Sequence, residues 1–282
     1  MQSGRRRFVA GAMALGLMGL LPAPGRAAAA FASRRISVKT MGVGSDVVMI
    51  PGLGSSPSIW QDSVAAVPGY RYHLVQVKGF AGTAAEANGS GAVVEPVAEE
   101  IARYISAMGL KRPALIGHSM GGMLAMLLAT RFPAMPGKLM VIDMTPAGAG
   151  MVGGTASGMG LFATRLGNYF TGTKGGRQMF QQLMGMFGAD ASENDPDTTG
   201  AALQELAKMD LTPDLPKIKA PMTVLHATPA NAEQRAAIAQ RYRAAYAGAK
   251  GARLIPVSPS GHMIMFDQPK RFAEEMRAFL RG

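Results

Sequence analysis

The chain has 282 residues, 48% of them hydrophobic and 17% charged, which is ordinary for one large globular domain or two small ones. This composition argues against a disordered chain, a collagen-like chain and a polytopic membrane protein. The sequence contains no cysteine, which excludes disulfide scaffolds, thiolate metal sites, iron–sulfur clusters, cysteine nucleophiles and a lipid anchor on an N-terminal cysteine. The formal charge is +11. Whether it indicates a binding partner depends on where the basic residues lie along the chain.

Residues 1–32 have the three regions of a secretory signal peptide. Three arginines stand at positions 5–7, an apolar stretch covers positions 8–21, and a run of small residues follows at positions 27–30. Two arginines ahead of a variable residue and two apolar ones resemble the twin-arginine export motif. We therefore expect a periplasmic or secreted protein, in which residues 33–282 form the functional domain.

The cleavage point of this segment has three alternatives, after Ala29, Ala30 or Ala32. An uncleaved membrane anchor is the competing interpretation, but an apolar stretch of about 14 residues is short for a helix that crosses a bilayer. We therefore expect no stable membrane insertion after cleavage. Removal of the segment takes away four arginines and leaves 25 basic and 18 acidic residues.

The remaining basic residues are spread along the chain without the interleaved aromatic residues of a surface on which nucleic-acid bases stack. They include Arg34, Arg35, Lys111, Arg112, Lys217, Lys219, Arg241, Arg243, Lys270 and Arg271. A solvated surface is the simpler interpretation, and we expect no nucleic-acid partner.

Short apolar runs alternate with longer helical patterns after the signal segment. The runs typical of strands are Val47–Ile50, Tyr72–Val77, Pro113–Gly117, Lys138–Asp143, Met222–Ala227 and Arg253–Val257. Between the second and third of them, apolar residues recur at three- and four-residue steps over 93–108, which predicts an amphipathic helix. Strands that are apolar on both sides are expected where helices cover both faces of a parallel sheet. The sequence predicts an α/β fold with a mostly parallel central sheet.

The segment from about 147 to 208 departs from this alternation. It begins with a run rich in glycine and methionine, continues with aromatic and methionine residues at helical spacings, and then becomes polar. An insertion of this length carries its own helices more often than it forms a plain connection. We interpret it as a helical cap over a cleft, in which flexible methionine side chains provide an apolar lining. The alternative is that these methionines only fill a helical core.

The strongest motif surrounds Ser119, in the sequence Gly117-His118-Ser119-Met120-Gly121. It fits the G-x-S-x-G nucleophile elbow, and it lies between a strand-like run and a helical one, as that motif requires. The two glycines allow close approach of backbones at a sharp turn. Ser119 is then exposed at the N-terminus of the next helix, where amide groups and the helix dipole stabilise an oxyanion.

A second glycine-rich segment, Pro51–Gly54, follows the first predicted strand and precedes Trp60. A phosphate-binding turn is the alternative interpretation, but the lysine and the spacing of a P-loop are missing. Together with the elbow and the turn 79–82, this segment resembles the α/β-hydrolase family of serine esterases and lipases, although Pro51 stands where that family often has histidine. The resemblance implies that the amides of Leu53 and Met120 form an oxyanion hole.

His262 follows the last predicted strand, in Pro259-Ser260-Gly261-His262. Its order and context match the general base of a hydrolase whose residues follow the order Ser, acid, His. The other three histidines lie inside the elbow or within strands. Asp267, a few residues on, is expected to cap the final helix.

The acid that would orient His262 has more than one candidate. Most members of the resembled family carry an aspartate after the strand that corresponds to Met222–Ala227, but here that loop has Asn231 and no carboxylate. Haloalkane dehalogenases of the same fold place the acid after the preceding strand, where this chain has Asp143. We expect Asp143 to be the acid; the alternatives are Asn231 as a polar orienter, Asp210, or no acid.

These residues predict a secreted serine hydrolase, most simply one that cleaves a carboxylic ester through an acyl-enzyme. Serine at the elbow argues against epoxide hydrolase and dehalogenase chemistry, which need a carboxylate nucleophile there. The expected partner is a small to medium, mostly apolar ester, and neither a cofactor nor a metal is expected. The alternative is a catalytically impaired protein of the same fold that binds an apolar ligand under the cap.

Overall fold

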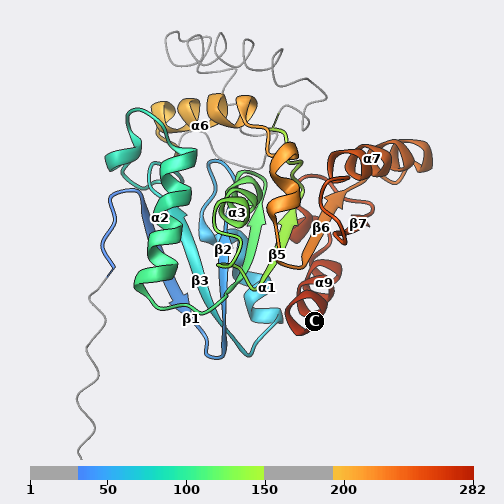
Figure 1. The fold of residues 1–282 in the computed structure, drawn as a ribbon, viewed down its shortest axis with the longest axis horizontal. Coiled ribbons are helices and arrows are strands. Elements are labelled where there is room, and N and C mark those ends of the chain that lie inside the picture. Colours follow the sequence, from blue (N-terminus) through green and yellow to red (C-terminus); the bar gives the residue numbers. More distant parts are fainter. Residues whose placement is uncertain (1–30, 149–192) are drawn as a thin grey trace, which may run out of the picture. The chain divides into compact units, whose positions relative to one another are not determined.

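The computed structural model describes residues 31–148 and 193–282, and their centre is a sheet of seven strands (Figure 1). The strands are β1 (Ile36–Met41), β2 (Ser45–Ile50), β3 (Tyr70–Val77), β4 (Ala114–His118), β5 (Lys138–Ile142), β6 (Met222–Ala227) and β7 (Arg253–Val257). Their order in space is β1-β3-β2-β4-β5-β6-β7. Only β1 is antiparallel to its neighbour. The predicted α/β fold with a mostly parallel sheet is therefore confirmed.

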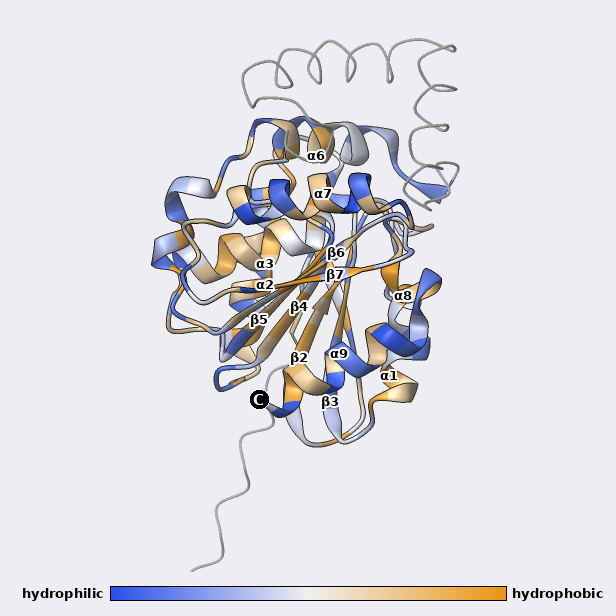
Figure 2. Cartoon of the chain, turned by 90° about the vertical axis from the view of Figure 1, so that its right-hand side faces the viewer, coloured by the Kyte–Doolittle hydropathy of each residue, from blue (hydrophilic) through white to orange (hydrophobic). Residues whose placement is uncertain are grey.

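Helices cover both faces of this sheet. The described ones are η1 (Pro57–Trp60), α1 (Gln61–Ala66), η2 (Glu86–Asn88), α2 (Val94–Ala107), α3 (Met120–Arg131), α6 (Pro196–Lys208), η5 (Thr212–Lys217), α7 (Ala232–Ala245), α8 (Ile264–Asp267) and α9 (Pro269–Arg281). Figure 2 shows α2, α3 and α7 on one side of the sheet and α1, α8 and α9 on the other. Among the described residues, no helix is both long and apolar enough to cross a membrane.

The core consists of two apolar layers, one on each face of the sheet. Along β2, Val48 and Ile50 join the layer under α2 and α3, whereas Val47 and Met49 join the layer under α1 and α9. All four side chains are fully buried. Because side chains alternate along a strand, burial on both faces requires the continuous apolar runs from which the strands were predicted.

The strand β1 was not predicted. Its residues are mostly exposed, and only Ile36 is buried. It lies at the edge of the sheet and runs antiparallel to β3. An edge strand with one buried side chain needs no apolar run. Its sequence therefore lacks the continuous apolar residues from which the other six strands were predicted.

The two ends of the predicted cap segment are paired with each other. The N–H of Gly148 donates to the carbonyl of Met209 at 3.0 Å, and the N–H of Leu211 donates to the carbonyl of Pro146 at 2.9 Å. Between these bonds, Ala147 and Asp210 form an antiparallel bridge. Residues 146–148 and 209–211 thus form a closed stem, while residues 149–192 of the predicted cap lie outside the described part of the chain.

The last part of the predicted cap segment, 193–208, contains α6 and is bound to the domain. Both carboxylate oxygens of Glu205 accept backbone N–H groups, from Val93 at 2.6 Å and from Val94 at 3.1 Å. Val93 is the N-cap of α2 and Val94 is its first residue, and their N–H groups have no acceptor inside that helix. The hydroxyl of Thr198 donates to the carbonyl of Asn88 at 3.1 Å. A residue of the insertion thus caps a helix of the main domain.

Candidate active site

Ser119 lies at the sharp turn between β4 and α3, where a nucleophile elbow was predicted. Its backbone has φ 53° and ψ −121°, a conformation that is costly for a residue with a side chain and persists where the surroundings impose it. Its N–H donates to the carbonyl of Ile142 at the end of β5, at 2.9 Å. Ser119 is half-buried, whereas its neighbours His118 and Met120 are buried.

The glycines of this turn are required by contacts between backbones. A Cβ atom on Gly117 would lie 2.1 Å from the carbonyl oxygen of Gly121, and one on Gly121 would lie 2.1 Å from that of Ile50. Neither position has room for a side chain, because the obstructing atoms belong to the backbone. The spacing of the motif therefore follows from how closely α3 approaches β2 and β4.

The loop after β2 lies directly against Ser119. A Cβ atom on Gly52 would be 3.2 Å from the Cβ of Ser119 and 3.0 Å from Nδ1 of His118. Leu53, the next residue, is buried at this place. Met120 begins α3, so its N–H is one of the first-turn donors that have no acceptor within the helix. The two residues named for an oxyanion hole, Leu53 and Met120, thus directly follow Gly52 and Ser119 in the chain.

Asp143 lies one residue beyond the end of β5 and is hydrogen-bonded to His262. The Nδ1–H of His262 donates to Oδ2 of Asp143 at 2.7 Å. The other carboxylate oxygen, Oδ1, accepts the N–H of Ala227 at 2.9 Å and the hydroxyl of Tyr242 at 3.0 Å. Asp143 is buried, with 7% of its surface exposed. The structure therefore brings together the acid and base candidates, which are far apart in the sequence.

His118 connects this pair to the elbow. Its Nε2–H donates to the backbone carbonyl of His262 at 3.0 Å, and the two imidazole rings lie 4.6 Å apart between centroids. Burial, together with the nearby His262, lowers the pKa of His118 to about 3, so this ring is neutral at physiological pH. Through this hydrogen bond, the neutral ring of His118, the residue that precedes Ser119, holds the backbone of His262 close to the elbow.

The loop before His262 is held by residues that follow it. The carboxylate of Asp267 accepts the N–H of Gly261 at 2.7 Å, and the side-chain amide of Gln268 donates to the carbonyl of Pro259 at 2.6 Å. The expectation that Asp267 caps the final helix is wrong, because α9 begins at Pro269 with Gln268 at its N-cap. Asp267 belongs to α8 and fastens the loop that carries His262.

The two alternative candidates for the residue that orients His262 are Asn231 and Asp210. Asn231 is exposed and is the N-cap of α7, where its side chain accepts the N–H of Gln234 at 2.9 Å. The carboxylate of Asp210 accepts the N–H of Thr212 at 2.8 Å. The structure thus gives both side chains local backbone partners. Tyr242, in contrast, contacts Asp143 and was not among the predicted site residues.

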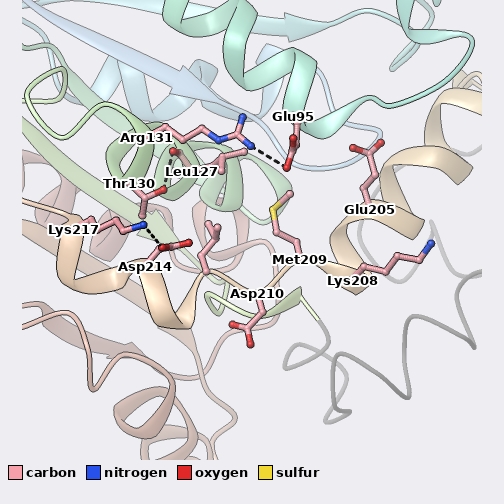
Figure 3. A pocket seen from close by; sticks show the side chains of 11 residues that line it. Glu95, Leu127, Thr130, Arg131, Glu205, Lys208, Met209, Asp210, Asp214 and Lys217 are labelled. Carbon is pink, nitrogen blue, oxygen red and sulfur yellow. Dashed lines mark hydrogen bonds and ion pairs between the residues drawn. The ribbon is translucent and has the colours of Figure 1, made fainter.

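A separate cavity of about 790 Å³ lies between α2, α3, α6 and η5 (Figure 3). Four of its charged side chains form two ion pairs: Arg131 binds Glu95 at 3.0 Å, and Lys217 binds Asp214 at 2.6 Å. Neither Ser119 nor His262 lines it. In the part of the chain that is described, no group of three or more His, Asp or Glu residues could hold a metal ion.

His226 on β6 is a buried histidine whose titration affects stability. It is 1% exposed, it stacks on Tyr242 with ring centroids 4.3 Å apart, and burial lowers its pKa from 6.5 to about 4. Between these pH values the unfolded chain binds a proton that the folded chain does not. The stabilising contribution is therefore complete above about pH 6.5 and is lost as the pH falls towards 4, at up to about 1.4 kcal/mol per pH unit.

We expect His226→Phe, which keeps an aromatic ring against Tyr242, to flatten this dependence. Between about pH 7 and pH 5, the free energy of unfolding of the variant should fall by about 2 kcal/mol less than that of the wild type. Urea denaturation at the two pH values measures the difference. Equal losses in both proteins would show that His226 is not neutral and buried in the folded state.

Residues 47–275 match the Alpha/beta hydrolase family. The chain belongs to this family. It is 28% identical over 206 residues to a pimeloyl-acyl-carrier-protein methyl ester esterase of Vibrio atlanticus, a match that covers 66% of this chain and 76% of the esterase. It is 32% identical over 97 residues to a candidate carbamate hydrolase, RutD, of Pantoea ananatis, which covers 34% of this chain and only 35% of that relative.

Two solved structures illustrate the shared hydrolase fold. The esterase EaEST of Exiguobacterium antarcticum has a TM-score of 0.66 at 20% identity, over 88% of this chain and 96% of the esterase. The enol-lactonase of Burkholderia xenovorans has a TM-score of 0.62 at 18% identity, over 88% and 96% of the two chains. The family and the methyl ester esterase relative indicate a hydrolase of esterase type, which agrees with the resemblance noted in the sequence.

Proposed function

We propose that this hydrolase is a serine esterase that acts through an acyl-enzyme. The observation that carries the proposal is the 2.7 Å hydrogen bond between Asp143 and His262, at a base whose backbone is fastened to the elbow of Ser119 by His118. A carboxylate that accepts Nδ1–H fixes the tautomer in which Nε2 carries the lone pair. That nitrogen is then the base that activates the serine hydroxyl.

In the proposed reaction, Oγ of Ser119 attacks the ester carbonyl carbon while Nε2 of His262 takes the hydroxyl proton. The tetrahedral oxyanion is stabilised by the N–H groups of Leu53 and Met120. When the intermediate collapses, the bond to the alcohol oxygen breaks and His262 returns the proton to that oxygen. Water repeats the sequence on the acyl-enzyme and releases the carboxylic acid. The Asp143 carboxylate stabilises the imidazolium in each step.

The substrate we propose is a small to medium carboxylic ester with a mostly apolar acyl or alcohol group. This class is supported by the methionine-rich composition of the insertion between β5 and β6, because thioether side chains provide an adaptable apolar surface. The methyl ester esterase among the relatives supports the same reaction type.

Labelling with an organophosphonate tests this function without knowledge of the natural ester. We expect the reagent to modify the peptide that contains Ser119, as found by mass spectrometry, and to block hydrolysis of a short-chain p-nitrophenyl ester. A folded protein that is neither labelled nor active would overturn the esterase proposal. That outcome would favour the alternative, a catalytically impaired protein that binds an apolar ligand.

We also propose that the protein is exported through its twin-arginine-type signal and that its mature chain retains Phe31. The ring of Phe31 packs against Tyr104 at 5.0 Å between centroids, and the guanidinium of Arg103 lies 4.3 Å from the centre of the same ring. Arg103 also donates to the carbonyl of Ala32 at 2.6 Å. A peptidase needs an accessible, extended segment, and residues held in this way do not provide one.

We therefore expect cleavage after Ala29 or Ala30 rather than after Ala32. Expression of the full chain in an export-competent bacterium, followed by N-terminal sequencing of the periplasmic product, measures the first residue. A mature chain that begins at Ser33 would contradict the assignment. A product that keeps the whole segment and stays in the cytoplasm would contradict export itself.

A further inference from the structure

The two carboxylate oxygens of Asp143 accept hydrogen bonds from different donors. Tyr242 and the N–H of Ala227 both donate to Oδ1, at 3.0 and 2.9 Å. His262 takes Oδ2, at 2.7 Å. A carboxylate without these two donors could rotate about its Cβ–Cγ bond, so that neither oxygen would lie in line with Nδ1–H of the imidazole. With both donors on Oδ1, one orientation of the carboxylate is favoured.

The Tyr242 ring is itself fixed in place. It lies flat against His226, with 4.3 Å between centroids and 18° between planes, and Tyr246 stacks on it at 6.2 Å and 9°. Only 5% of Tyr242 is exposed. Burial and the adjacent Asp143 charge raise the pKa of Tyr242 well above its usual value, so the hydroxyl keeps its proton and remains a donor over the range in which esterases are assayed.

We infer that Tyr242 is a positioning residue for the proposed acid–base pair: its hydroxyl on α7 holds the Asp143 carboxylate in the orientation that presents Oδ2 to Nδ1 of His262. The inference rests on the proposed esterase function. It assigns α7, a helix outside the β4–α3 elbow, a part in catalysis through Asp143. Tyr242 acts through the aspartate and does not touch the reacting atoms.

The matched comparison is Tyr242→Phe against Tyr246→Phe. Both tyrosines are buried in the same stack, but the hydroxyl of Tyr246 donates to the carbonyl of Met144 at 2.6 Å instead of to a carboxylate. Each variant loses one hydroxyl and keeps its ring. Only the first variant takes a donor away from Asp143.

We expect Tyr242→Phe to lower kcat about 10-fold with KM nearly unchanged, since a hydrogen bond to a charged group is lost. The midpoint of the acidic limb of kcat/KM should also move to higher pH, because a carboxylate with fewer donors attracts the proton of His262 more strongly. Tyr246→Phe should change kcat less than about twofold and leave the midpoint in place.

The titratable groups around Asp143 allow this pH profile to be interpreted. They are His118 on β4, His226 on β6, His262 in the loop before α8, Tyr242 on α7 and Tyr246 at the C-cap of α7. Burial lowers the pKa of His118 to about 3 and that of His226 to about 4, so neither changes charge above about pH 5. Burial keeps both tyrosines protonated.

The rate of organophosphonate labelling provides a second readout that does not depend on the choice of ester. If the wild type is labelled at Ser119 and Tyr242→Phe is labelled at the same rate with the same pH midpoint, the positioning role is wrong. Equal effects of Tyr242→Phe and Tyr246→Phe on rate and midpoint would also overturn it, since both would then reflect packing. Failure of the proposed function differs, because the wild type itself would not be labelled. Thermal unfolding verifies that both variants are folded.

Discussion

Replacing Ser119 with alanine is expected to lower kcat for an activated ester by about 10⁵- to 10⁶-fold and to abolish labelling by an organophosphonate. The proposed mechanism leaves the variant with an oxyanion hole and a base but with no atom that can form the acyl-enzyme. The fold should be unaffected, because the turn is imposed by backbone contacts of Gly117 and Gly121 and alanine fits the space of serine. Steady-state kinetics and thermal unfolding measure the two effects.

Ser63→Ala is the matched control for this experiment, because Ser63 is a buried serine of α1 outside the proposed machinery. Its kcat should stay within about twofold of the wild-type value, since a serine remote from the reacting atoms contributes only to packing. Residual activity of Ser119→Ala above about one hundredth of wild type would mean that another group is the nucleophile, because loss of a nucleophile costs far more.

Replacing Asp143 with asparagine should lower kcat by about 10⁴-fold, because an amide favours the wrong tautomer of the imidazole. The amide can donate to Nδ1 of His262, and the proton then resides on Nε2, which can no longer act as the base. The amide also resembles the carboxylate in size and still accepts hydrogen bonds from Ala227 and Tyr242. The loss should therefore fall on kcat much more than on the folded structure.

Asn231→Ala distinguishes the two candidate orienters of His262. Asn231 caps α7 through Gln234, so its loss should reduce the free energy of unfolding by about 1 kcal/mol. Its kcat should remain within about threefold of wild type, since a helix cap that does not contact the imidazole has no direct part in proton transfer. If Asn231→Ala lowers kcat by orders of magnitude while Asp143→Asn does not, Asp143 is not the acid.

The parts of the fold that were predictable depend on signals that are local in the sequence. The six apolar strands could be located because burial on both faces leaves no polar alternation, and Gly117 and Gly121 marked the sharp turn because no other residue fits there. The polar edge strand β1 lacks both signals. It owes its position to pairing with β3, a contact that its own residues do not specify.

The parts of the site that were missed depend on contacts between distant segments. Tyr242 lies on a helix 99 positions away from Asp143, and a single tyrosine on a polar helix resembles any partly buried residue. His118 was recognised as part of the elbow, but its bond to the carbonyl of His262 spans 144 positions. The position of Asp143 after β5 was predictable from strand order, whereas its three donors come from β6, α7 and the loop after β7.

The closed stem formed by 146–148 and 209–211 brings the two ends of the inserted segment together, so the length of the chain between them can change without moving these ends. Loop closure is already achieved at the stem, so a longer segment costs little, about 0.6 kcal/mol for each doubling of its length. The segment 193–208 has to be kept, because Glu205 caps α2. We therefore expect a graft that replaces only the residues between Gly148 and 193 to leave the hydrogen bond between Asp143 and His262 in place.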